Sequence, residues 1–437
     1  MLFYSNIYLF LFLPISLLLF YFHKLLKFDH KTLLIVCGIF FYSWWNYKYV
    51  PLILLIIFIN YFFALKLTLT KSNKLILFFS ILFNILILII FKYLDFFILN
   101  LNYVFGINLE TYGLPFPLAL SFITFQVIAM LVNCYDKEIE NLRLKDFFIF
   151  IIFFPQLIAG PIVKFNYMIK QFNNKENQKF NLVCFNLGIL LILIGLVKKI
   201  LLAENLGNFV DYGYENINLL NFYLSWLLTF SFTFQLYFDF SGYIDMATGS
   251  ALLFNIILPK NFNSPFKSLS IIDFWKKWHI TLGEFLTNYI YSPWAKSIKK
   301  LNFTKSMMLI IVVFLIAGIW HGPTWCFLIF GLIHGLGLVT NHIYRKNTIF
   351  ELNTFLSCFI TFNFVNLSFI FFRSQNFLEA FSILNNLVNY SRIIEITNNL
   401  ALVEILDIKF YLIFLSAILI SFFGINSNQI FEKYKQN

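Results

Sequence analysis

The sequence predicts an all-α, polytopic integral membrane protein, and three observations carry the prediction. Of its 437 residues, 60% are hydrophobic and only 12% are charged, whereas soluble domains average roughly 25% charged residues. Its 61 Phe and 23 Tyr supply more apolar surface than a disordered chain could leave in water. Its charge-free runs have membrane length and lack the alternation of a barrel, so the spanning elements are predicted to be helices.

The charge-free runs predict roughly 10–12 membrane crossings. In order they are 1–23, 49–65, 75–91, 111–135, 147–163, 180–197, 216–238, 306–344, 352–372 and 410–431, with 306–344 counted as two spans and 32–47 as a candidate short one. The first run follows no basic region and contains no small-residue cleavage site, so we expect it to stay as the first membrane helix. No polar connector is long enough to build a separate core, and we expect one membrane-embedded domain over 1–437.

Proline and glycine interrupt several of these runs. Pro115 and Pro117 open one, residues 155–161 hold two prolines and a glycine in another, and residues 318–323 interrupt the longest. Irregular backbone at membrane depth is tolerated where neighbouring protein or a water-filled cavity satisfies its polar groups. These positions therefore predict re-entrant or cavity-lining segments.

Two connectors are basic. Residues 164–179 are expected to form a short loop, and residues 260–305 hold eight lysines against two acids, which is +6 of the total charge of +11. The positive-inside rule places 260–305 in the cytoplasm. We expect these lysines mainly to orient the protein and contact anionic headgroups; direct contact with substrate phosphates is the alternative.

Residues 270–290 are predicted to form one amphipathic helix at the cytoplasmic interface. Ser270 and Asp273 have the spacing of a capping box, and apolar and aromatic residues then recur at helical spacing. His279 falls on the edge of the apolar face and is expected to point toward the membrane-embedded body.

Metal and nucleophile chemistry find no support in the sequence. The five cysteines stand singly in apolar sequence and are expected to be small core residues. The chain has no phosphate-loop, HExxH or GxSxG motif and no metal-ligand spacing. We expect no metal, no tightly bound cofactor and no nucleic-acid partner.

His321 is the strongest candidate for chemistry. It lies in LIAGIWHGPTWCFLIFGLIHG, with no formally charged side chain between Lys305 and Arg345. An ionisable group in such a place is costly, so a catalytic or substrate-binding role is favoured over a buried structural hydrogen bond. His334, between Gly331 and Gly335, is expected to form an interhelical hydrogen bond rather than act as a base.

The other polar residues in apolar sequence have weaker signals. His23, His30 and His342 adjoin or lie near charged residues at predicted span ends and are expected to be solvated, while Arg373 is expected to anchor a helix end. Gln235 and Asp239 share a helical face, whereas Asp239 and Asp245 lie about 240° apart, which argues against a shared dyad. For Asp239, a structural polar lock and a site-lining role both remain open.

A membrane-embedded base without a protein nucleophile suits direct acyl transfer. A neutral imidazole would take the proton from an acceptor hydroxyl while that oxygen attacks a thioester, which is worth roughly 10²–10⁴ in rate. Backbone N–H groups freed by the broken helix could stabilise the developing oxyanion.

Five segments together resemble the membrane-bound O-acyltransferases, within the bacterial branch of alginate and peptidoglycan O-acetylation proteins. They are FFPQLIAGPIVKF (153–165), QLYFDFSGYIDMATG (235–249), NFNSPFKSLSIIDFWKKWHITLGEFLTNYIYSP (261–293), GIWHGPTWCFLIFGLIHG (318–335) and FIFFRS (369–374). The resemblance implies that His321 is the near-invariant histidine of the family and that His279 is its second active-site histidine. The chain departs from the branch at 292–295, where a glycine turn is missing, and at Pro323 and Thr324.

The resemblance also implies a donor, a partner and a product. Acetyl-CoA is the expected acyl donor on the cytoplasmic side, and a periplasmic SGNH-type, esterase-like protein is the expected partner that completes transfer to a glycan acceptor. We expect an O-acetyltransferase of the cell inner membrane that acts toward peptidoglycan first and an exopolysaccharide such as alginate second.

The residues assigned to this reaction follow from the same expectations. His321 is the base, and His279 orients the thioester or donates a hydrogen bond. Trp275, Trp278, Asp239 and Trp325 are expected to bind substrate. D-alanyl transfer to teichoic acid, which would use a carrier-protein thioester, and non-enzymatic glycan transport are the alternatives.

Overall fold

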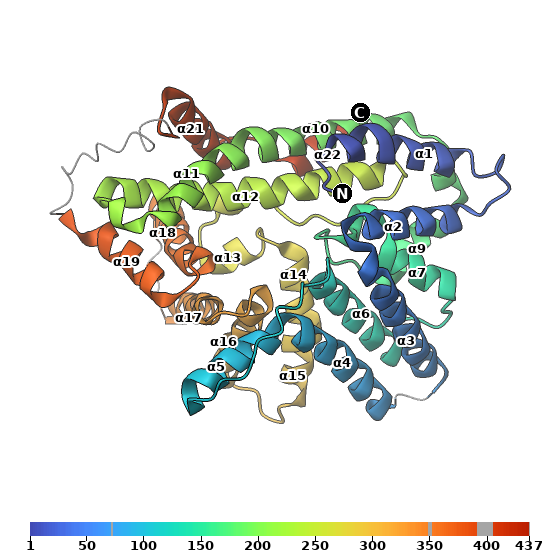
Figure 1. Cartoon of the computed structure of the whole chain (residues 1–437), viewed down its shortest axis with the longest axis horizontal. Helices are drawn as coiled ribbons and strands as arrows, with labels where there is room; N and C mark the ends of the chain where they lie inside the picture. Colours follow the sequence, from blue (N-terminus) through green and yellow to red (C-terminus); the bar gives the residue numbers. More distant parts are fainter. Residues whose placement is uncertain (71–72, 348–351, 391–404, 437) are drawn as a thin grey trace. The chain divides into compact units, whose positions relative to one another are not determined.

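The computed structural model describes residues 1–70, 73–347, 352–390 and 405–436, and these residues form helices and no strand. Figure 1 shows them as helices of varied length, some joined by short turns and others by long loops such as residues 106–119. The longer helices are α1 (Leu13–Tyr21), α2 (His30–Asn46), α3 (Val50–Leu69), α4 (Lys74–Leu88), α5 (Leu94–Phe105), α6 (Leu120–Tyr135), α7 (Leu144–Ile152), α9 (Phe165–Asn173), α10 (Leu182–Leu196), α11 (Glu204–Glu215), α12 (Phe222–Leu252), α16 (Phe303–His321), α17 (Trp325–Asn347), α18 (Thr354–Arg373), α19 (Phe377–Val388), α21 (Ile408–Phe422) and α22 (Ser427–Gln436).

Shorter α-helices and π-helical segments also occur in the described part of the chain. Four single π-helical segments occur, and such segments are frequent at functional sites. They are η1 (Tyr8–Phe12), η3 (Ile89–Tyr93), η5 (Val197–Ala203) and η8 (Leu286–Tyr291). The short α-helices are α8 (Phe154–Leu157), α13 (Ile271–Trp275), α14 (Ile280–Phe285) and α15 (Ser292–Ser297).

The structure confirms an all-α membrane protein with fewer long spans than the charge-free runs suggested. Within the described residues, six helical stretches are long and apolar enough to cross a membrane, or seven if the bent pair α21–α22 is counted as one span. The difference arises because adjacent runs join into one stretch, such as 30–69, whereas others form short apolar helices such as α6. The chain is thus a multi-pass membrane protein.

The chain divides into two compact units, and α12 contributes to both. The first unit contains residues 1–193 and 243–259, and the second contains 194–242 and 260–437. The single domain expected over 1–437 stays a prediction.

Buried polar contacts hold the first unit together. The Lys31 ammonium of α2 pairs with Asp146 of α7 and donates to Asn173 Oδ1 at the end of α9. Asn60 of α3 and Asn84 of α4 exchange two amide hydrogen bonds, at 3.0 and 2.6 Å. Such interhelical pairs satisfy polar groups that lipid cannot.

Two expectations about this unit are wrong. His23 and His30 are buried rather than solvated, because their rings bond the carbonyl oxygens of Phe20 (2.8 Å) and Phe172 (3.0 Å). The basic stretch 164–179 is also no simple loop, since it contains α9, whose apolar side is buried.

The second unit contains every histidine singled out for chemistry. Within it α16 and α17 form an antiparallel hairpin, α18 packs beside α17, and α13 lies against α17. The break predicted at 318–323 is confirmed, since α16 ends at His321 and α17 begins at Trp325.

The continuous amphipathic helix predicted over 270–290 is wrong. Ser270 does cap α13, since its Oγ accepts from the Asp273 N–H at 3.1 Å. The helix then stops after Trp275, and α14 starts anew after His279, which has a left-handed φ of 43°. The main chain at residues 261–263 holds the break open. Asn263 N donates to Lys277 O and Ile280 N donates to Asn261 O, each at 2.9 Å.

Candidate active site

His321 sits at the turn of a tight helical hairpin. It is the last residue of α16, and Gly322 turns the chain toward α17. A Cβ on Gly322 would lie 2.1 Å from the Phe327 ring, so any other residue there would require that ring to move. The hairpin therefore fixes the backbone on which His321 is carried.

Glycines let the two helices of the hairpin approach backbone to backbone. A Cβ on Gly318 would lie 2.3 Å from the Phe327 carbonyl oxygen, and one on Gly331 would lie 2.3 Å from the Phe314 carbonyl oxygen. Small residues at helix contacts are the usual means of close packing in membranes.

Aromatic rings surround the half-buried His321 imidazole. The ring centroids of Trp320, Phe372 and Phe330 lie 5.0, 5.1 and 5.9 Å from it. These rings limit the water near the imidazole and hold its orientation by packing.

Trp320 also joins His321 to the second predicted histidine. Its ring lies 5.0 Å from that of His321 and 6.3 Å from that of His279. The structure thus brings both histidines against one indole, although they are 42 residues apart in sequence.

His279 is locked in place by Asn261. Its side chain is 2% exposed, and its Nδ1 lies 3.2 Å from Asn261 Oδ1. That oxygen also accepts from the Thr281 N–H at 3.1 Å and the Thr281 hydroxyl at 2.9 Å. Because a backbone N–H can only donate, the Asn261 atom facing it is the carbonyl oxygen, and Nδ1 of His279 must carry the proton.

The other nitrogen of His279 is consequently an acceptor. Burial lowers the pKa of His279 to about 3, so the ring is neutral near pH 7. With Nδ1 protonated, Nε2 carries the lone pair. Nε2 can therefore accept a hydrogen bond, which suits the orienting role expected for His279; the role itself stays a prediction.

His334 forms the interhelical hydrogen bonds predicted for it. Trp275 Nε1 donates to His334 Nδ1 at 3.2 Å, and His334 Nε2 lies 2.8 Å from Ser368 Oγ. Since indole can only donate, Nε2 carries the proton and donates to Ser368, whose hydroxyl donates to Val365 O at 2.7 Å. Both ring nitrogens are used, which ties α13, α17 and α18 together.

The predicted substrate-binding tryptophans occupy different surroundings. Trp278 is buried among rings, with Phe262 at 5.1 Å and Phe369 at 5.4 Å. Trp275 bonds His334 and also borders a cavity. Trp325, at the start of α17, is 51% exposed. Their roles in substrate binding stay predictions.

Asp239 lines a polar cavity between α11 and α12, which we call the Lys199 cavity. Its volume is about 500 Å³, and Asp239 pairs with Lys199 of η5 at 2.8 Å. Gln235 lines the same cavity, which confirms that it shares a face with Asp239. The lining residues are Lys199, Ile200, Ala203, Glu204, Asn205, Gly207, Asn208, Asp211, Gln235 and Asp239.

The last residue of α18 contacts Asp211 of the Lys199 cavity, and the residue before it contacts His321. Arg373, the last residue of α18, pairs with Asp211 of the cavity at 2.9 Å and lies over the Tyr214 ring. Its neighbour Phe372 contacts the His321 ring. Arg373 therefore does end a helix as predicted, and it fixes that end to α11.

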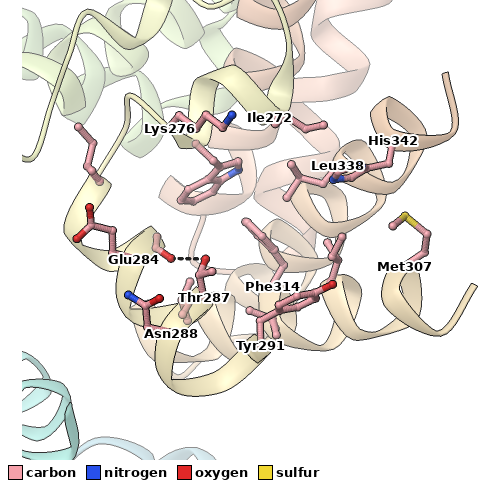
Figure 2. A pocket seen from close by; sticks show the side chains of 16 residues that line it. Ile272, Lys276, Glu284, Thr287, Asn288, Tyr291, Met307, Phe314, Leu338 and His342 are labelled. Carbon is pink, nitrogen blue, oxygen red and sulfur yellow. Dashed lines mark hydrogen bonds between the residues drawn. The ribbon is translucent and has the colours of Figure 1, made fainter. Parts of the chain in front are cut away.

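A second cavity, of about 630 Å³, lies in the same unit, and part of its lining comes from the lysine-rich segment 260–305 (Figure 2). One wall comes from the chain around α13, α14 and η8 and carries Lys276, Glu284 and Asn288. Phe314 of α16 and Leu338 of α17 form the opposing apolar walls. We call it the Lys276 cavity.

Sequence reasoning missed three residues of this region. Asn261 gave no signal, because its role depends on contacts with a segment 18 residues away. Lys199 could have been found as a charge inside a membrane-length stretch, the rule that identified His321. Trp320 was visible beside His321, but its contact with His279 required the fold.

No group of three or more metal-binding side chains occurs among the described residues. All five cysteines lie among those residues, and none forms a disulfide there; three are buried and two are half-buried.

Known proteins similar to the chain are named for O-acetylation or for D-alanyl transfer. The chain is 40% identical to the peptidoglycan O-acetyltransferase of Helicobacter pylori, over 89% of this chain and 80% of that protein. It is 31% identical to a probable alginate O-acetylase AlgI of Azotobacter vinelandii, over 86% and 76% respectively. A teichoic acid D-alanyltransferase of Streptococcus thermophilus is 28% identical over 58% of this chain and 68% of that protein.

The family model for membrane-bound O-acyltransferases matches residues 39–382. That range includes both histidines, the α16–α17 hairpin and the two cavities. The chain belongs to the membrane-bound O-acyltransferase family and is an acyltransferase.

Proposed function

We propose that the protein transfers an acetyl group from a cytoplasmic thioester toward a hydroxyl of a cell-envelope glycan, and that it does so in the inner membrane. Its similarity to a peptidoglycan O-acetyltransferase supports peptidoglycan as the first choice of glycan. The observation that carries the chemistry is the pair of imidazoles against Trp320, one of them at the tip of the α16–α17 hairpin.

In the proposed reaction His321 acts as the general base. Its neutral imidazole removes the proton from the acceptor hydroxyl as that oxygen bonds to the thioester carbonyl carbon. The carbon–sulfur bond then breaks, and the departing thiolate takes the proton back from the imidazolium. The products are an acetyl ester and a free thiol, and His321 is neutral again.

His279 acts beside it as a neutral acceptor. Because Asn261 holds the proton on Nδ1, Nε2 presents a fixed lone pair from a buried position. Such a group orients a hydroxyl through the hydrogen bond it accepts, which fixes the direction of attack.

The Lys276 cavity is the proposed entry for the donor. It lies in the lysine-rich segment that the positive-inside rule assigns to the cytoplasm, and its walls are largely apolar. Acetyl-CoA suits such an entrance, since its phosphates are anionic and its pantetheine arm is slender. A secreted SGNH-type protein is the proposed partner that completes transfer to the polymer on the other side.

The test replaces His321 by Ala in the full-length protein. We expect loss of acetyl transfer of at least 10²-fold, with normal abundance and thermal stability in detergent. Thr304→Ala, on the exposed first turn of the same helix, is the matched control and should keep full activity.

Chemical analysis of the envelope distinguishes the other candidates. Unchanged O-acetyl content in a well-folded His321→Ala strain would rule out the enzymatic reading of this site. Ester-linked D-alanine in place of acetate would favour teichoic acid alanylation, the activity named for the more weakly similar Streptococcus thermophilus protein.

A further inference from the structure

A third cavity lies between two membrane-length helices of the second unit. Its volume is about 860 Å³, and α17 and α18 form its two long walls. Both helices are long and apolar enough to cross a membrane. Leu336 and Ile360 line the cavity and are 47% and 49% exposed, so the cavity opens toward the lipid when these helices span a bilayer. We call it the Arg345 groove.

The lining changes from apolar to polar along the axis of α17. In chain order, the lining residues of this helix are Ile333, Leu336, Gly337, Thr340, Asn341, Tyr344 and Arg345. Ile333 and Arg345 are about 18 Å apart along the axis, at 1.5 Å per residue. That distance is about half of the roughly 30 Å hydrocarbon core, so the groove has the depth of one leaflet.

The polar end of the groove faces the cytoplasm. Ser270 lines it, and an Arg345 N–H donates to Ser270 Oγ at 3.2 Å. Ser270 belongs to the lysine-rich segment 260–305, which the positive-inside rule assigns to that side. The guanidinium therefore lies at the level of the cytoplasmic headgroups, which are partly anionic.

The groove has a positive charge that its lining does not balance. Among the described residues, none that lines it is Asp or Glu, whereas Glu284 lines the Lys276 cavity and Glu204 the Lys199 cavity. Arg345 forms no ion pair with a described residue, and its contact with Ser270 is one hydrogen bond from a group that has five N–H donors. A phosphodiester supplies the negative charge and the acceptor oxygens that suit the other donors.

We propose that the Arg345 groove binds an anionic phospholipid of the cytoplasmic leaflet, with its phosphate at Arg345 and one acyl chain between α17 and α18. A soluble phosphate would use the polar end alone and leave the apolar depth unfilled. A neutral lipid would fill the depth but bring no net charge to the guanidinium. A lipid with both a negative headgroup and an acyl chain matches the two ends of the groove.

The bound lipid should also stabilise the region around His334. Arg345 bonds Ser270, Ser270 caps α13, and Trp275 of α13 bonds His334 of α17. A ligand that binds only the folded protein raises its stability by mass action. The melting temperature should therefore rise with the concentration of anionic phospholipid.

The experiment counts the lipids bound to the full-length protein in neutral detergent by native mass spectrometry and follows thermal unfolding of the same samples. The probes are phosphatidylglycerol and phosphatidylcholine with identical acyl chains, and glycerol phosphate as a headgroup without chains. One arginine near the headgroups is worth about 1 kcal/mol, so the first phosphatidylglycerol should bind about fivefold more tightly than the first phosphatidylcholine. It should also raise the melting temperature more, whereas glycerol phosphate at the same concentration should neither bind nor compete.

Four variants localise the site. Arg345→Gln should remove the preference of about fivefold, and Arg345→Lys, which keeps the charge, should retain most of it. Lys346→Gln is the matched control, because it removes the same charge one position away, yet Lys346 lies over the Phe303 ring at 4.2 Å and does not line the groove. Leu336→Trp fills the apolar depth, and it should weaken both lipids several-fold while the preference between them stays.

Each opposite result overturns the proposal. Equal affinity for the two lipids, the same response to Arg345→Gln and Lys346→Gln, or unchanged binding in Leu336→Trp would each do so. Competition by glycerol phosphate as strong as that of the lipid would indicate a simple anion site and would also exclude the proposal. Lipid binding needs no acyl transfer, so these outcomes are independent of the proposed function and of the His321→Ala test.

Discussion

Replacing Asn261 by Ala should destabilise the protein and impair transfer together. Asn261 Oδ1 is the shared acceptor for His279 Nδ1, the Thr281 N–H and the Thr281 hydroxyl, at 3.2, 3.1 and 2.9 Å. Asn261 is 1% exposed, so water cannot take its place without rearrangement. Each buried donor left without an acceptor costs about 1–3 kcal/mol.

The size of the loss follows from which donors can adapt. The Thr281 hydroxyl can rotate and the His279 ring can exchange its proton between nitrogens, but the Thr281 N–H is fixed by the backbone. At least one orphan donor and at most three therefore remain, which predicts a loss between about 1 kcal/mol, for one donor at the lower cost, and about 9 kcal/mol, for three at the upper cost. The His279 tautomer is no longer held, so Nε2 ceases to be a constant acceptor and activity should fall as well.

The assay combines thermal unfolding in detergent with acetyl transfer from a thioester. Asn166→Ala is the control, since Asn166 is exposed and its one amide bond goes to the Glu138 carbonyl. An Asn261→Ala protein with the melting temperature and activity of wild type would refute the assignment of Asn261 as the lock on His279.

Three further predictions concern the hairpin and the other buried groups. Ser368→Ala removes the acceptor for His334 Nε2–H and should cost about 1–3 kcal/mol in thermal unfolding. Gly331→Ala should cost about 1–3 kcal/mol, because its Cβ meets the Phe314 carbonyl oxygen; Gly337→Ala, which meets only the movable tip of Phe364, should cost less. Burial lowers the pKa of His279 from 6.5 to about 3, so below pH 6.5 the unfolded chain binds a proton that the folded protein does not. Wild type should therefore lose up to about 1.4 kcal/mol per pH unit from pH 6.5 toward 3, measured relative to His279→Asn, and parallel pH profiles would contradict this.

Features that depend on residues close together in the chain were predictable from the sequence. Long runs without charge identify the membrane helices, and the glycines and proline around His321 identify the hairpin, because each acts through its own backbone. His334 was predictable as a structural residue because the neighbouring glycines allow close approach of another helix.

Features set by distant backbone were not predictable. The apolar spacing from Ile271 to Ile290 suits one helix, but hydrogen bonds from residues 261 and 263 open it at 276–279. His23 and His30 stand near charged residues, which suggested solvent, yet their partners are carbonyl groups buried by packing. For the helix break and for His30, the deciding atoms belong to the main chain of another segment, which composition does not reveal.

The α16–α17 hairpin also bears on how such an enzyme can change its substrate. At Gly318 and Gly331 the main chains of α16 and α17 touch directly, so no side chain there can be lengthened or shortened. Ordinary substitution at these contacts therefore cannot adjust the position of His321. Changes in the surroundings of His321 must then come from side chains, such as the rings of Phe330 and Phe372. The fold thereby separates a backbone position that substitution cannot easily shift from surrounding side chains that mutation can reshape.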